Sequence, residues 1–320
     1  MEIKQSQIID PMKINENTWE QEFNEWVTNG TSKSTRRAYN RDVAYFWKWV
    51  KNNLKQDKSY PATTEQVIQF CLYHIDINSP YPLKLSTLRR YLSSVSIRHS
   101  ELGLISPSIH PKVKVLLRRA RAAKKESPSK KEAITVDILN LLSETCDQSY
   151  NGTRDKAILL VGFSAGGRRR SEIINFNYED LKIVEKGYLL NVKSSKTDQF
   201  GDGLVAPIYG HAAVALKCWL VKSGIRKGPL FRGIKPNNTF YDSISARTIN
   251  LIVKRRIKMI GLNPDHYGAH SLRSGFLTES ARQGINISEA MLLSGHKSIK
   301  TAQGYCRTNK IENNKASFLY

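Results

Sequence analysis

The chain has 320 residues, 40% of them hydrophobic, which is enough for a globular protein of two domains. Fifty Lys and Arg against 28 Asp and Glu give a net charge of +22, which favours a nucleic-acid partner over a general solubility charge. No apolar run is long enough to span a membrane, the start MEIKQSQIIDPMK does not resemble a secretory signal, and no cysteines have C-x-x-C spacing. We therefore expect a reduced protein of the cytoplasm, associated with the nucleoid if its partner is DNA.

The first third of the chain has helical patterning after an irregular tail over residues 1–15. An amphipathic helix is predicted in STRRAYNRDVAYFWKWVKN, and another begins where Thr63 and Thr64 precede EQVIQFCLYHI. Two more helices fit SPYPLKLSTLRRYLSSVSIRHSELG, which Gly103 ends, and HPKVKVLLRRARAA. The apolar face of the first helix consists of Tyr39, Val43, Phe46, Trp47 and Val50.

Residues 124–132, KKESPSKKE, are charged and hold Pro and Ser but no apolar anchor, which predicts a domain boundary. We expect a helical DNA-binding domain over 16–123, a second domain over 133–310 and a tail over 311–320. The basic run from Arg118 to Lys131 is interpreted as a strap that contacts DNA phosphates, with a solvated linker as the alternative. The predicted DNA-contacting cations are Arg36, Arg37, Arg41, Arg89, Arg90, Arg118, Arg119, Arg121, Lys124, Lys125, Lys130 and Lys131.

The second domain is predicted to be mainly helical with a small β-sheet. Thr135 can cap a helix that has Asp137 in its first turn, and TRDKAILLVGFSAG predicts the next helix. Two apolar runs around a polar loop in GYLLNVKSSKTDQFGDGLVAPIYG predict a β-hairpin. Helical patterning then continues to about Asn309.

Three stretches carry residues suited to phosphate chemistry: GRRRSEI at 167–173, HSLR at 270–273 and SGHKSIKTAQGY at 294–305. Residues three apart share a helix face, so His270 and Arg273 can act on one phosphate, although such pairs are commonly exposed helix-end groups. A carboxylate three residues after Arg169 can orient its guanidinium, but Arg168 is also within reach of Glu172.

Taken together, in this order and spacing, the stretches resemble the tyrosine recombinase (phage integrase) family. The family pattern is an Arg in an R-x-S-E-like helix start, a hairpin Lys, H-x-x-R, a G-H step and a Tyr nine residues later. The resemblance covers 133–310 well and the first half loosely, as a SAM-like core-binding domain of the Cre-like or Xer-like kind. It implies Arg169 with Glu172 as its supporting acid, Lys196 (with Lys193 on the same hairpin), His270, Arg273, His296 and the nucleophile Tyr305 as site residues.

The resemblance also implies a mainly α, two-domain C-clamp around double-stranded DNA with inverted-repeat core sites. It implies a homotetramer that cleaves and rejoins strands through a 3′-phosphotyrosyl intermediate and a four-way junction, with accessory DNA-bending proteins as further candidate partners. No metal and no ATP are needed, because arginines and histidines can stabilise charge on the phosphate and the covalent bond conserves energy. A phenol, with a pKa of ~10, is both a workable nucleophile and a workable leaving group.

Three other interpretations compete with a recombinase. GFSAG at 162–166 matches the G-x-S-x-G elbow of serine hydrolases, which needs a strand before Ser164 and a helix after it. A DNA-binding regulator would keep the fold and lose the chemistry. A type IB topoisomerase or telomere resolvase would share the chemistry and differ in outcome. A metal site is not expected, since the pair His266 and His270 lacks the Glu of H-E-x-x-H.

Overall fold

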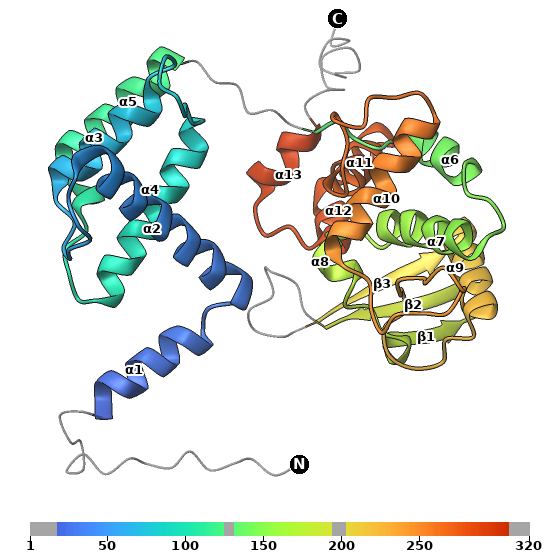
Figure 1. The fold of residues 1–320 in the computed structure, drawn as a ribbon. Helices are drawn as coiled ribbons and strands as arrows, with labels where there is room; N and C mark the ends of the chain where they lie inside the picture. Colours follow the sequence, from blue (N-terminus) through green and yellow to red (C-terminus); the bar gives the residue numbers. More distant parts are fainter. Residues whose placement is uncertain (1–17, 125–130, 194–202, 307–320) are drawn as a thin grey trace, which may run out of the picture. The chain divides into compact units, whose positions relative to one another are not determined.

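The computed structural model describes residues 18–124, 131–193 and 203–306. The chain divides into two compact units, Met1–Pro128 and Ser129–Tyr320, and each is described by itself (Figure 1). The described residues form helices and one three-stranded antiparallel sheet, which confirms the predicted mainly α class with a small sheet. In these parts of the chain, no helix is long and apolar enough to cross a membrane.

The first unit is a bundle of helices. Its elements are α1 (Thr18–Asn29), α2 (Lys33–Leu54), α3 (Thr64–Ile75), α4 (Leu85–Glu101), the short 3-10 helix η2 (Pro107–Ile109) and α5 (Pro111–Lys124). The predicted start of α3 is confirmed, because Thr63 and Gln66 form a reciprocal capping box. Helix α4 begins later than its sequence pattern suggested, at Leu85, since Pro80 and Pro82 disfavour helical backbone before them.

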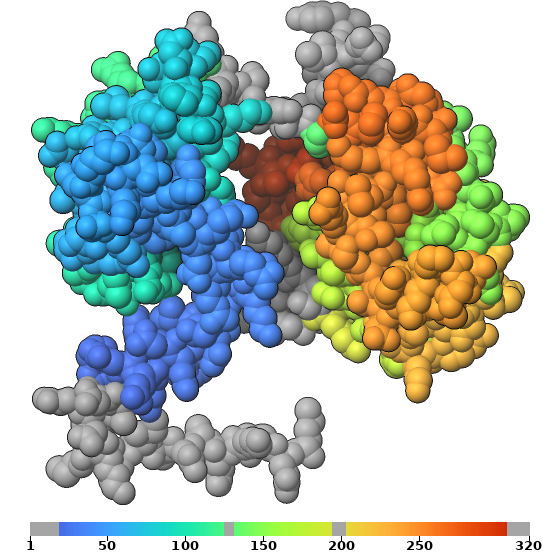
Figure 2. All heavy atoms as spheres, in the orientation of Figure 1, coloured from blue at the N-terminus to red at the C-terminus, as the bar shows by residue number. Residues whose placement is uncertain are grey.

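Aromatic rings fill the core of the first unit. Phe46 and Phe70 are fully buried, with ring centroids 5.2 Å apart in an edge-to-face arrangement, and Trp49 packs on Phe70 at 5.3 Å. Helix α1, in dark blue in Figure 2, extends away from the other helices and leaves Trp26 77% exposed. The core therefore consists of α2 to α5 and does not depend on α1.

The second unit places helices around the sheet. Its elements are α6 (Val136–Glu144), α7 (Tyr150–Ser164), α8 (Arg170–Ile173), η3 (Tyr178–Asp180), β1 (Leu181–Val184), β2 (Gly187–Val192), β3 (Leu204–Tyr209), α9 (Gly210–Ser223), α10 (Ala246–Met259), α11 (His270–Arg282), α12 (Ile287–Ser294) and α13 (Ile299–Cys306). The predicted hairpin is β2 paired with β3. Strand β1 was not predicted, because LKIV is only four residues long and its two central residues are exposed.

Helix α7 lies at the centre of this unit and packs against α6, α9 and α11. Asp155 on α7 is fully buried and accepts hydrogen bonds from Arg256 on α10, at 2.8 Å, and from Arg154, also at 2.8 Å. Ser164 is the last residue of this helix and follows no strand, so the hydrolase-elbow interpretation of GFSAG is wrong.

The chain enters the second unit along α11. The backbone N–H of Ile134 donates to Ser271 O at 3.0 Å, and that of Glu132 donates to His266 O at 2.9 Å. Thr135 occupies the N-cap position of α6 but its side chain makes no capping hydrogen bond. Instead, the Glu279 carboxylate of α11 accepts from the N–H of Val136 at 3.5 Å, so a distant residue supplies part of this cap.

Candidate active site

Helix α11 positions both residues of the H-x-x-R motif. His270 is its first residue, and Arg273, one turn later, is 1% exposed. The Arg273 Nη1 donates to the carbonyl of Gly167 at 3.2 Å. Gly167 allows this approach because its φ is +67° and an added Cβ would lie 2.5 Å from the Cα of Arg273. The glycine before the three arginines therefore lets the two motifs meet.

Burial separates the roles of the neighbouring arginines. Arg168 is 1% exposed and donates to the carbonyls of Ala165, at 2.5 Å, and Leu293, so it ties α7 to α12. Arg169 keeps 25% of its side chain exposed and donates to Glu172 Oε1 at 2.7 Å. Glu172 Oε2 accepts from the Arg169 backbone N–H at 3.2 Å, so the carboxylate is fixed by the backbone while it orients the guanidinium. Arg169 is thus the accessible arginine of the run 168–169.

His296 meets Arg273 directly after a helix end. Helix α12 ends at Ser294, and Gly295 turns the chain in a left-handed conformation with φ of 65°. Arg273 Nε donates to His296 Nε2 at 3.2 Å, and Ser294 Oγ lies 2.7 Å from His296 Nδ1. Burial, followed by the charges of Arg273 and Arg169, lowers the pKa of His296 to about 4, so the ring is neutral at pH 7.

Helix α13 brings Tyr305 to the same place. The Tyr305 hydroxyl lies 2.9 Å from His270 Nε2, and the Tyr305 ring centroid lies 6.0 Å from that of His296. Thr278 Oγ1 on α11 donates to the Tyr305 backbone carbonyl at 3.1 Å, which fixes the end of α13. Thr278 was not singled out in the sequence, because a threonine inside a helix carries no local signal for this contact.

His270 is able to accept a proton from that phenol. Although the residue is exposed, surrounding protein atoms and then the charges of Arg273 and Arg169 lower its pKa below the usual value. Its imidazole is therefore neutral at pH 7, with a lone pair available on one ring nitrogen. The five residues Arg169, His270, Arg273, His296 and Tyr305 thus form one cluster that we call the tyrosine cluster.

Of the two candidate lysines on the hairpin, only Lys193 lies among the described residues. Lys196 falls outside the described residues. Lys193, at the end of β2, forms an ion pair with Asp180, which is 6% exposed, and this hydrogen bond raises the Lys193 pKa above its usual value. A lysine held in this way is a poor proton donor, so the geometry does not favour Lys193 as an alternative to Lys196.

The cations predicted to contact DNA differ in whether they already have a partner within the protein. Arg90 pairs with the fully buried Asp42 and stacks on Tyr91, 4.7 Å from its ring centroid. Lys124 donates to the Leu83 carbonyl at 3.4 Å. Lys131, which belongs to the second unit, donates to the Asp265 carbonyl within that unit. The other exposed cations are Arg37, Arg89, Arg118, Arg119, Arg121 and Arg41, the last of which lies 3.6 Å from Asp42. Lys125 and Lys130 fall outside the described residues.

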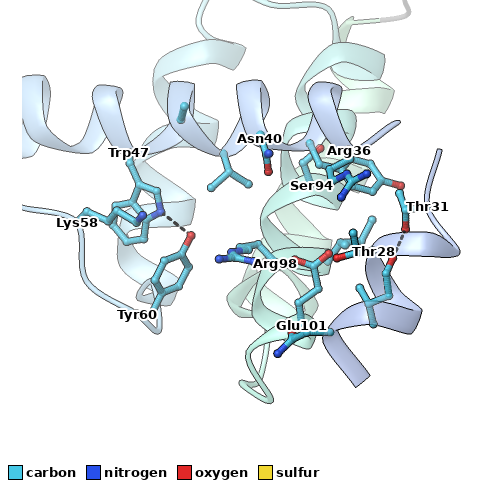
Figure 3. A pocket seen from close by; sticks show the side chains of 16 residues that line it. Thr28, Thr31, Arg36, Asn40, Trp47, Lys58, Tyr60, Ser94, Arg98 and Glu101 are labelled. Carbon is cyan, nitrogen blue, oxygen red and sulfur yellow. Dashed lines mark hydrogen bonds and ion pairs between the residues drawn. The ribbon is translucent and has the colours of Figure 1, made fainter. Parts of the chain in front are cut away.

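A cavity of about 540 Å³ in the first unit contains none of the tyrosine cluster (Figure 3). It lies between α1, α2 and α4, where Trp47 donates to the Tyr60 hydroxyl at 3.1 Å and Arg36 points into the space. Across the described part of the chain, no group of three His, Cys, Asp or Glu side chains is placed to hold a metal ion.

Known proteins are similar to this chain over the same residues. The profile of the phage integrase family matches residues 132–312, which include every member of the tyrosine cluster. The chain belongs to the phage integrase family of tyrosine recombinases. An integrase/recombinase described as a XerD homolog, from Selenomonas ruminantium, is 30% identical over 289 residues, covering 87% of this chain and 82% of the relative. Recombinase Cre of Escherichia phage P1 is 24% identical over 280 residues, covering 81% and 79%.

Solved structures share the fold. The Tn1549 transposon integrase in complex with transposon right end DNA matches with a TM-score of 0.67 at 14% identity, covering 93% of this chain and 98% of that one. A lambda integrase dimer bound to a core site matches with a TM-score of 0.59 at 18% identity, covering 91% and 94%. This recombinase is thus an enzyme of DNA recombination, and its family acts without a metal ion or ATP.

Proposed function

We propose that this tyrosine recombinase cleaves and rejoins DNA at specific sites through a 3′-phosphotyrosyl intermediate on Tyr305. One observation carries the assignment: the Tyr305 hydroxyl lies 2.9 Å from His270 Nε2. The same cluster holds His296 and the guanidinium of Arg273, with Arg169 close enough to lower the pKa of both histidines. A nucleophile, a neutral base and fixed cations are what phosphoryl transfer without a metal requires.

The proposed cleavage step exchanges one phosphate ester bond for another. The phenolic oxygen attacks phosphorus while His270 accepts the phenolic proton, a new Tyr–O–P bond forms, and the bond to the 5′ oxygen of the next nucleotide breaks. Arg169 and Arg273 donate to the non-bridging oxygens, where negative charge grows in the transition state. Lys196 supplies the proton that the departing 5′ oxygen needs. Rejoining runs the same step in reverse with a 5′ hydroxyl from the partner strand.

The DNA partner follows from charge and from the relatives. The exposed arginines of α2, α4 and α5 are suited to phosphate contacts. We infer that they belong to a core-binding domain over residues 16–123, which a basic linker over 124–132 joins to a catalytic domain over 133–310 and a tail over 311–320. The lambda integrase relative was solved as a dimer on a core site. We expect a homotetramer on two double-stranded sites with inverted repeats, which exchanges strands in pairs through a four-way junction.

Tyr305→Phe tests the nucleophile, because it removes one oxygen and retains the ring. The variant is expected to bind DNA normally and to form no covalent adduct on a nicked suicide substrate. Tyr209→Phe is the matched control, since Tyr209 is 43% exposed at the end of β3, and it is expected to retain the adduct. An adduct that persists in Tyr305→Phe refutes the assignment and makes Tyr209 and Tyr267 the next candidates.

The outcome of the reaction is tested separately. A recombinase joins flanks from two target sites, whereas a type IB topoisomerase relaxes supercoiled DNA at one site and a telomere resolvase makes hairpin ends. A DNA-binding regulator forms no adduct on any substrate. Sequencing the products from a plasmid with two target sites distinguishes these outcomes, and exchanged flanks are expected.

A further inference from the structure

The Ser294 hydroxyl is placed to control the ring of His296. Ser294 is the last residue of α12, is 1% exposed, and lies two residues before the histidine across the turn at Gly295. Its Oγ is 2.7 Å from His296 Nδ1, which is a short hydrogen bond for an oxygen and a ring nitrogen. The ring is thus held by a buried hydroxyl at Nδ1 and by the Arg273 guanidinium, which approaches both ring nitrogens.

The contacts of Arg273 decide which ring nitrogen carries the proton. A guanidinium can only donate, and Arg273 Nε points its N–H at His296 Nε2 over 3.2 Å. This contact places Nε2 to accept, as the unprotonated nitrogen with the lone pair. In a neutral imidazole the proton then resides on Nδ1, where Ser294 Oγ is the acceptor. The Nη2 of Arg273 also lies 3.1 Å from Nδ1. If Nδ1 held the lone pair instead, Nη2 and the Ser294 hydroxyl would compete for it, and an Nε2–H would meet the Nε–H of Arg273 with no acceptor.

We propose that Ser294 is a positioning residue that fixes His296 in the Nδ1–H tautomer and holds its Nε2 edge toward Arg273. The tautomer of His296 does not depend on the proposed function, whereas its expected effect on DNA cleavage does. With the ring so fixed, Nε2 faces the guanidinium that is expected to bind the scissile phosphate, close to Tyr305. Without the hydroxyl, Nδ1–H loses this acceptor, and the ring can rotate or exchange tautomers.

A serine hydroxyl serves this purpose because it is short and lies next to the turn. The side chain reaches Nδ1 only because Gly295 adopts a left-handed conformation that carries His296 back over the end of α12. No periodicity or spacing in the sequence predicts the contact. It depends on the turn and on α11 lying against α12, which brings Arg273 against the ring.

The first test reads the tautomer in the free protein. Long-range ¹H–¹⁵N spectra of protein labelled with ¹⁵N-histidine distinguish a protonated from an unprotonated ring nitrogen, and His296→Gln assigns the signal. We expect a single Nδ1–H tautomer in the natural protein and in Ser294→Thr, and a mixture of tautomers in Ser294→Ala. A proton on Nε2 in the natural protein overturns the proposal, whatever the enzyme does to DNA.

The second test measures cleavage. Ser294→Ala is expected to slow single-turnover cleavage of a nicked suicide substrate about tenfold, the effect of one lost hydrogen bond, with DNA affinity unchanged. Ser294→Thr is expected to restore most of the rate. Ser280→Ala is the matched control, because Ser280 is also buried and donates to the Phe276 carbonyl at 2.8 Å without touching the tyrosine cluster.

The two tests separate the inference from the proposed function. A natural rate in Ser294→Ala, or an equal loss in Ser280→Ala, overturns the role of the hydroxyl. An adduct that survives Tyr305→Phe overturns the proposed function instead and leaves the tautomer measurement valid.

Discussion

Glu172→Gln removes one negative charge from the most enclosed ion-pair network beside the tyrosine cluster. The carboxylate is 3% exposed, accepts from Arg169 at 2.7 Å, and lies 3.8 Å from the guanidinium of Arg168. Glutamine has nearly the same shape and retains one oxygen acceptor. The substitution therefore tests the charge and the second acceptor oxygen with little change in packing.

The magnitude follows from the burial of the two arginines. Breaking a buried ion pair by removing one partner costs about 3–5 kcal/mol, because the remaining charge is uncompensated. Arg168 is 1% exposed and receives no compensation from water, whereas Arg169 keeps 25% of its side chain exposed. Since glutamine still accepts one hydrogen bond, we expect a loss of about 3 kcal/mol in the free energy of unfolding of the second unit.

Urea unfolding followed by ¹⁹F NMR of 5-fluorotryptophan measures this loss in the second unit alone. Trp219 is its one tryptophan and is fully buried, while the other four occupy positions 19, 26, 47 and 49. Asp265→Asn is the matched control, because its exposed carboxylate pairs with Lys254 in the same unit, and such a pair is worth only about 0.2–1 kcal/mol. A loss in Glu172→Gln no greater than that of the control would refute the reasoning.

Four further outcomes are expected. Gly275→Ala should cost about 1–3 kcal/mol in urea unfolding, since an added Cβ would lie 1.8 Å from the Ile134 carbonyl, and unchanged stability contradicts that packing. The free energy of unfolding should fall as pH drops from 7 to 5. Unfolded histidines have pKa values of ~6.5, whereas the pKa values of His74, His270 and His296 are lowered in the folded state, so the unfolded chain binds more protons over this range. A flat or opposite slope counts against the lowered pKa values. Cleavage should proceed in EDTA, and its loss on chelation would exclude the proposed mechanism. DNA affinity should fall roughly tenfold or more between 50 and 200 mM salt, and a salt-insensitive affinity would place the positive charge away from the interface.

Features with a local cause could be predicted from the sequence. The start of α3 depends on Thr63 and Gln66, which are neighbours in the chain, and the end of α4 is marked by Gly103 with a φ of +66°. The spacing of His270 and Arg273 places both on one face of a helix wherever that helix lies. Family resemblance then assigned these residues to one site, because their order and separations are shared.

Features that depend on distant contacts could not be predicted. Three consecutive arginines leave the register open in the sequence. The burial of Arg168 against Leu293, together with the hydrogen bond from Arg169 to Glu172, distinguishes these two candidates. The acceptor for the Val136 N–H is Glu279, 143 residues away, so a nearby threonine was a misleading signal for the cap. Ser294 was missed for a different reason: its partner His296 is only two residues away, but the contact forms only through the turn at Gly295.

Locating the covalent bond by mass spectrometry tests the central claim most directly. A nicked suicide substrate traps the adduct, nuclease and protease digestion leaves a short nucleotide on one peptide, and fragmentation identifies the modified residue. We predict a 3′-phosphate ester on Tyr305. A nucleotide on any other residue, such as Tyr209 or Tyr267, or a link to the 5′ end of the broken strand, would contradict the account.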